Sequence, residues 1–124
     1  MTYLIDTSAL LRILRNEVDL AWRDVARRGL IMLCEPVIAE TLVSVDAKRY
    51  TAFEEQLRET YPYATVPDAI WDLSAAVRRE LVPHSAYKGL GVADLVIAAT
   101  AIRLKLRSYM RTPTSKRWPD SYLS

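Results

Sequence analysis

Met1-Thr-Tyr-Leu-Ile-Asp-Thr-Ser8 begins the chain with a short apolar run that stops at a carboxylate. The β-forming residues of this run predict a short buried strand, and the apolar spacing after Ser8 predicts a helix. Asp6 would then stand at the carboxyl end of the first strand, which is where open parallel sheets bind their ligands. A helix N-cap is the simpler role for the same aspartate.

Length and composition describe one globular domain. The chain has 124 residues, of which 51% are hydrophobic and 26% charged, so it can bury a real core. The net charge of +2 does not by itself indicate a nucleic-acid binder. Cys34 is the sole cysteine, which fits a reducing compartment. No signal peptide and no apolar stretch of membrane-spanning length is recognisable, so a cytoplasmic location is expected.

Apolar segments alternate between strand-like and helix-like lengths along the chain. Strands are predicted at 3–5, 31–34 and 64–66, and this alternation with helices favours an α/β fold with a short parallel sheet. The segment from Arg107 to Ser124 shows neither helical nor alternating periodicity, and no strand is predicted there. Helices are expected at 9–15, 18–28, 37–45, 47–59, from about 67 to 81, and 92–104.

Two further acids stand in apolar surroundings. Glu40 lies in the middle of the apolar helical segment Val37–Val43, and Asp94 lies at the start of the most apolar helix. Each has a simpler explanation, because Glu40 can point to solvent and Asp94 can cap its helix. If they meet Asp6, a divalent cation would relieve their repulsion. Oxygen ligands without a histidine or cysteine cluster indicate Mg²⁺ or Mn²⁺.

Three motifs together resemble the signatures of the PIN-domain family, and of its VapC toxins in particular. The motifs are Leu4-Ile-Asp-Thr-Ser-Ala-Leu10, Glu35-Pro-Val-Ile-Ala-Glu-Thr-Leu42 and Gly91-Val-Ala-Asp-Leu-Val-Ile-Ala-Ala-Thr100. They occur in the family's order and spacing over residues 1–106. The resemblance implies a PIN-like (Rossmann-like) α/β/α sandwich.

The resemblance also implies an activity and partners. It implies a Mg²⁺-dependent (or Mn²⁺-dependent) endoribonuclease, the toxin of a VapBC-type toxin–antitoxin module, with Asp6, Glu40 and Asp94 as the catalytic and metal-binding residues. A metal-activated water would cleave an RNA phosphodiester and leave a 3′-hydroxyl and a 5′-phosphate. Ser8 matches a hydroxyl near the metal. The implied partners are RNA, a VapB-type antitoxin and a second copy of the chain, without a membrane.

The C-terminal part departs from the family. After the buried helix the family carries a fourth acid, in a stretch like T-V-x-H-x-D-x-D-F, and this stretch is missing after Leu106. The expected organisation is therefore a PIN-like domain at 1–106 and an atypical tail at 107–124. A frameshift at or near Leu106 would explain the tail, because permitted codons with one restored base read K-L-T-V-V-H-E-D-A-D-F.

Two other functions compete with an active nuclease. The first is a catalytically impaired PIN-domain protein that only binds its antitoxin, because the fourth acid is missing. The second is a phosphoryl-handling domain of receiver type, which would need an acidic pair after the first strand and a lysine on a late strand, and neither is visible. Arg12, Arg15, Lys88 and Arg103 are the candidates for holding an RNA backbone.

Overall fold

Three short parallel strands form the centre of the protein. The computed structural model describes residues 2–109, with the backbone alone at 86–87 and 107–109. Strand β1 (Tyr3–Ile5) lies between β2 (Ile31–Met32) and β3 (Arg107–Tyr109). The register pairs Tyr3 with Ile31 on one side and Ile5 with Tyr109 on the other. The first strand of the chain is therefore the middle strand of the sheet.

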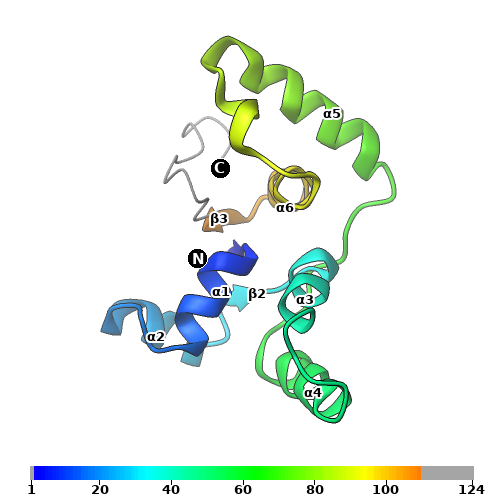
Figure 1. Cartoon of the computed structure of the whole chain (residues 1–124). Coiled ribbons are helices and arrows are strands. Elements are labelled where there is room, and N and C mark those ends of the chain that lie inside the picture. The colour runs from blue at the N-terminus through cyan, green and yellow to red at the C-terminus, as the bar shows by residue number, and fades with distance from the viewer. Residues whose placement is uncertain (1, 110–124) are drawn as a thin grey trace.

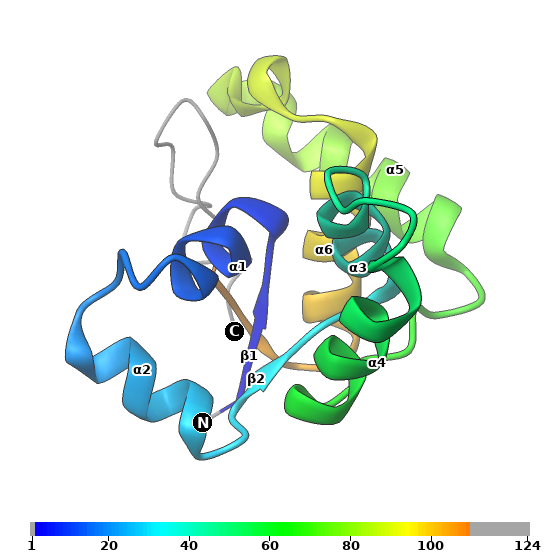
Figure 2. The ribbon, with the colours of Figure 1, turned by 60° about the horizontal axis from the view of Figure 1, so that its bottom comes forward.

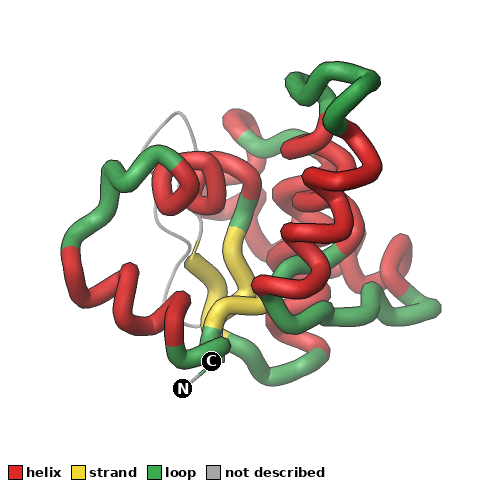
Figure 3. The backbone as a smooth tube through the Cα atoms, turned by 90° about the horizontal axis from the view of Figure 1, so that it is seen from below, coloured by secondary structure: helices red, strands yellow, loops and turns green. Residues whose placement is uncertain are grey.

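Helices cover both faces of this sheet, as Figures 1, 2 and 3 show. Two helices lie on one side, and four lie on the other. This arrangement confirms the predicted α/β fold with a short parallel sheet flanked by helices. The pair on one side is α1 (Thr7–Leu14) and α2 (Leu20–Arg27), and the four on the other are α3 (Glu35–Leu42), α4 (Tyr50–Thr60), α5 (Ile70–Leu81) and α6 (Val92–Arg103).

Local sequence signals fix several helix ends. Asp6 caps α1 and Asp19 caps α2, each by accepting a hydrogen bond from a backbone N–H in the first helical turn. Gly29 follows α2 with a φ of 71°, a left-handed conformation that favours glycine. Pro36 occupies the first turn of α3, where a missing N–H costs nothing.

The main apolar core lies around β1. Leu4, Ile5, Leu10, Ile31 and Ile97 are fully buried and belong to one cluster that joins the sheet to α1, α3 and α6. A second cluster joins α5 to α6 through Val77, Leu81 and their neighbours. Helix α6 contributes to both clusters, which explains why its sequence is apolar on nearly every side.

The third predicted strand is wrong. Residues 64–66 form no strand, and the chain makes only one isolated bridge there, between Leu33 and Tyr63. The Leu33 N–H donates to Pro62 O at 2.9 Å and the Ala64 N–H donates to Leu33 O at 2.9 Å. The pairing does not extend in either direction, because Pro62 lacks the N–H that the preceding rung would need and the paired segment enters α3 at Glu35.

The expectation that no strand follows residue 106 is also wrong. The backbone at Arg107–Tyr109 pairs with β1 although its sequence has no apolar run. The rest of the tail, 110–124, lies outside the described residues. Smaller differences concern helix ends: α1 begins at Thr7, α3 begins at Glu35, and α4 begins at Tyr50.

Within residues 2–109 no helix has both the length and the apolar character needed to cross a membrane.

Candidate metal centre

Asp6 lies at the carboxyl end of β1, directly before α1. Its side chain is only 3% exposed, and Oδ1 accepts a hydrogen bond from the Ala9 N–H at 2.8 Å. The N-cap role expected of this aspartate is therefore present. A cap uses part of a carboxylate's acceptor capacity, because two oxygens offer about four lone-pair sites. The side chain can cap α1 and still serve a ligand.

Glu40 reaches the same region from another element. It lies on the exposed side of α3, and its Oε1 accepts a hydrogen bond from the Thr7 hydroxyl at 2.7 Å. Thr7 directly follows Asp6 in the chain. This bond therefore ties the acid of α3 to the first residue of α1, next to the end of β1.

Asp94 lies in the first turn of α6. Its Oδ2 accepts a hydrogen bond from the Gly91 N–H at 3.1 Å, so the predicted capping role is present here too. Burial raises the pKa of the Asp94 carboxyl, the Gly91 hydrogen bond lowers it, and the negative charge of Glu40 raises it further. Asp94 and Glu40 therefore lie within electrostatic reach of each other.

The chemistry of these three residues suits a hard divalent cation, since all three offer carboxylate oxygens. Their arrangement falls short of a closed site. Among the residues that the structure describes, no three aspartate, glutamate, histidine or cysteine side chains lie in position to hold a metal ion. The described part of the chain brings the acids into one region without completing a coordination sphere.

Thr7 is a residue that the sequence analysis did not single out. Ser8 was chosen instead, and it lies exposed on the first turn of α1. The signal for Thr7 was its position: the residue after a cap begins the helix, so its side chain can turn toward a neighbouring element. Its partner Glu40 is 33 residues away in the chain, so no local sequence pattern indicates the contact between the two side chains.

The candidate RNA-binding cations are dispersed. Arg12 and Arg15 stand at the far end of α1 from Asp6, and Arg12 Nη2 donates to Glu17 O at 3.0 Å. Arg103 stands in the last turn of α6, whereas Asp94 stands in the first. That separation is about 13 Å at 1.5 Å per residue. Lys88, which is exposed and shortly precedes α6, remains the candidate nearest to Asp94 in the chain.

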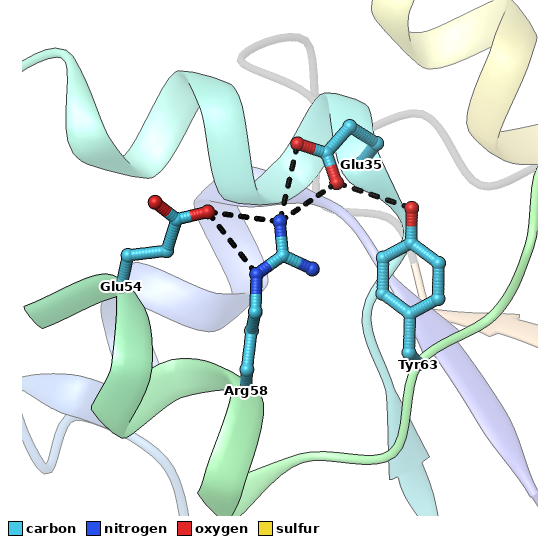
Figure 4. A network of polar contacts seen from close by, with 4 residues as sticks. All are labelled: Glu35, Glu54, Arg58 and Tyr63. Atoms are coloured by element: carbon cyan, nitrogen blue, oxygen red, sulfur yellow. Dashed lines mark hydrogen bonds and ion pairs between the residues drawn. The ribbon is translucent and has the colours of Figure 1, made fainter. Parts of the chain in front are cut away.

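A polar network braces the start of α3, as Figure 4 shows. Arg58 of α4 lies between two carboxylates, with Nη2 at 3.0 Å from Glu35 Oε2 and at 2.9 Å from Glu54 Oε2. The Tyr63 hydroxyl donates to Glu35 Oε2 at 3.1 Å, and the Arg58 guanidinium lies over the Tyr63 ring. The hydrogen bonds to Glu54 and then to Glu35 raise the pKa of Arg58. The network fixes α4 against the helix that carries Glu40.

Cys34 precedes α3 and is fully buried. Burial is the main cause that raises the pKa of its thiol to about 11. The thiol therefore stays protonated at neutral pH and behaves as a small apolar side chain.

Comparisons with known proteins agree with this architecture. Residues 3–108 match the sequence model of the PIN domain. No curated protein matches the sequence.

Several solved structures share the fold. A chain of the DNA-bound VapBC2 from Rickettsia felis aligns with a TM-score of 0.72 and 18% identity, over 97% of this chain and 95% of that one. DNA-bound VapBC from Salmonella typhimurium gives 0.70 and 15%, over 90% and 86%. VapC20 from Mycobacterium tuberculosis, a sarcin–ricin loop cleaving toxin, gives 0.57 and 19%, over 88% of each chain.

Proposed function

Because the chain belongs to the PIN-domain family, whose sequence model matches residues 3–108, we propose that it is a metal-dependent endoribonuclease and the toxin of a VapBC-type module. The observation that carries the proposal is the 2.7 Å hydrogen bond from Thr7 to Glu40. It draws the acid of α3 to the end of β1, where Asp6 lies. Asp94 adds a third carboxylate within electrostatic reach of Glu40.

Asp6, Glu40 and Asp94 would hold Mg²⁺ or Mn²⁺. When bound, the ion would supply a water of lowered pKa and a positive charge beside the reacting phosphate. The residues of the chain do the positioning: Asp6 is fixed by the Ala9 N–H, Asp94 by the Gly91 N–H, and Glu40 by the Thr7 hydroxyl. The expected products are a 3′-hydroxyl and a 5′-phosphate.

The expected partners follow from the same family membership. The solved VapBC structures from Salmonella typhimurium and Rickettsia felis contain DNA. For this chain we propose a VapB-type antitoxin as the protein partner and RNA as the substrate.

The first test measures metal binding. We expect Asp6→Asn to weaken Mn²⁺ binding measured by calorimetry, because it removes one negative charge from the site. The melting temperature should stay close to that of the parent, since asparagine is as good an N-cap as aspartate. Asp68→Asn, outside the proposed site, is the control. Equal Mn²⁺ affinity in the parent and in Asp6→Asn would exclude a shared site.

The second test measures activity. The parent should cleave a labelled single-stranded RNA in Mg²⁺ or Mn²⁺, chelation should stop the cleavage, and Asp94→Asn should reduce it strongly. A parent that binds antitoxin but cleaves no RNA would favour the other candidate, a catalytically impaired PIN-domain protein. That candidate is supported by the incomplete coordination sphere among residues 2–109.

A further inference from the structure

Strand β3 has a polar sequence, which is unusual for a parallel strand beside the central strand of a sheet. It pairs in parallel with β1, the central strand, in the register Tyr3–Arg107, Leu4–Ser108 and Ile5–Tyr109. Parallel strands between helical layers are usually rich in valine, isoleucine and leucine. Both other strands follow this rule, whereas Arg107-Ser-Tyr109 contains no aliphatic residue.

We propose that one base is missing from the codon of Leu106, and that the DNA beyond it still encodes the proper last strand, an acidic turn and a helix in the frame that this base restores. In that frame each new codon joins the third base of one present codon to the first two bases of the next. The second base of each new codon is therefore the first base of a present codon, and the known amino acid often fixes that base. The second base of a codon largely decides whether the encoded amino acid is apolar.

The restored strand is constrained by these rules. Tyr109 begins with TA, so position 109 must become leucine, isoleucine or valine whatever the third base of the preceding codon. Position 108 becomes phenylalanine, leucine, isoleucine or valine when Ser108 uses a TCN codon. The present strand has no aliphatic residue, and the restored frame supplies one at a position that codon choice cannot change.

A polar turn follows the restored strand. Tyr109 and Met110 together force tyrosine or histidine at position 110. Thr112 and Thr114 restrict positions 112 and 114 to tyrosine, histidine, asparagine or aspartate, and Pro113 makes position 113 a small residue or proline. One permitted reading of positions 107–115 is T-V-V-H-E-D-A-D-F.

A helical pattern comes next. Trp118 forces leucine, methionine or valine at position 118, the pair Trp118–Pro119 forces alanine at 119, and Tyr122 forces leucine, isoleucine or valine at 122. With the apolar residue available at 115, these positions are spaced as i, i+3, i+4 and i+7, the pattern of an amphipathic helix. The third possible reading frame gives no such pattern. In that frame the Met110 codon contributes to a cysteine or a stop codon, and the Trp118 codon contributes to a glycine codon.

The topology gives the acidic turn a role. Because Ile5 pairs with Tyr109, the carboxyl end of β3 lies beside the end of β1 and therefore near Asp6. Aspartates encoded a few residues later would join Asp6, Glu40 and Asp94. This last step rests on the proposed metal site, whereas the coding argument does not.

Sequencing the gene tests the coding argument directly. We expect the codons of Arg111 and Pro113 both to end in G, which makes positions 112 and 114 aspartate, and we expect no stop codon in the restored frame through position 122. A base other than G at the third position of either codon, or a stop codon in the restored frame, would overturn the proposal.

A chain with the base restored tests the physical consequence. We expect its melting temperature to exceed that of the parent, because a strand with an aliphatic residue at position 109 replaces Arg107-Ser-Tyr109. We expect Mn²⁺ affinity to rise by on the order of ten-fold, because another carboxylate joins the site. The matched control carries the restored base with asparagine codons at 112 and 114, and it should regain the melting temperature alone.

The two proposals fail separately. A restored chain that melts below the parent would contradict the shifted frame. A restored chain that melts higher but binds Mn²⁺ no better than its asparagine control would support the frame and overturn the proposed metal site.

Discussion

Asp94 couples the candidate site to stability through its protonation. Burial and the charge of Glu40 raise its pKa above the ordinary value of 3.8. The folded state therefore binds this proton more tightly than the unfolded state does. The stability gained from the protonated form is present at low pH and is lost as pH rises from about 3.8 through the raised pKa. At neutral pH the ionised carboxylate then costs stability.

Asp94→Asn removes that cost. We expect its melting temperature at pH 7 to exceed that of the metal-free parent, and the difference to shrink as the pH falls toward 4. Asparagine can still accept the Gly91 hydrogen bond through its side-chain oxygen, so the helix start is retained. Asp72→Asn, an exposed first-turn acid of α5, is the matched control. Parallel melting curves for Asp94→Asn and the parent across this pH range would contradict the expectation.

At the scale of elements, α6 holds the two core clusters together. Ile97 is fully buried in the cluster around β1, whereas Val92 of the same helix is 65% exposed. Ile97→Ala should destabilise the fold by about 2–5 kcal/mol, because it leaves a cavity. Val92→Ala should change the stability by less than about 0.5 kcal/mol. Urea unfolding of the two variants beside the parent measures both effects, and similar losses would mean that α6 is not the shared core element.

Elements with a strong local pattern were predictable, and those made by distant pairing were not. The apolar runs of β1 and α6 were sufficient to predict both elements. Asp6, Glu40 and Asp94 were proposed as site residues because each acid interrupts an apolar segment, and that assignment stays a prediction. Strand β3 was missed because backbone pairing with β1 forms it without an apolar sequence. The segment at 64–66 was predicted as a strand, yet Pro62 and the start of α3 at Glu35 limit the pairing there to one bridge.

The sequence indicates candidate site residues but not how they are arranged in space. The bond between Thr7 and Glu40 depends on how α3 packs against α1, which follows from the whole core. Trp22 likewise packs against the main core, edge-to-face on Tyr3 with ring centres 4.9 Å apart, and its local sequence does not indicate this contact. Long-range packing decides both cases.

At the scale of the whole molecule, the chain leaves large apolar side chains on its surface. Trp71 of α5 is 68% exposed, and it lines an apolar pocket with Pro36, Ala39 and Val66. On the other side of the sheet, Leu20 of α2 is 75% exposed. Contiguous exposed apolar surface is typical of protein interfaces, and aromatic anchors contribute strongly to them. The surface around Trp71 is therefore the expected contact between two copies of the chain.

Light scattering after size exclusion measures this association. At micromolar concentration the parent should have about twice the chain mass of 14.1 kDa. Trp71→Lys should give the monomer mass, because a buried unpaired ammonium is costly in an apolar interface, while Leu20→Lys should remain dimeric. A monomeric parent would contradict the homodimer. If Leu20→Lys dissociates the dimer and Trp71→Lys does not, the contact lies on the α2 side, since a charge disrupts association only where the partner's surface excludes water from it.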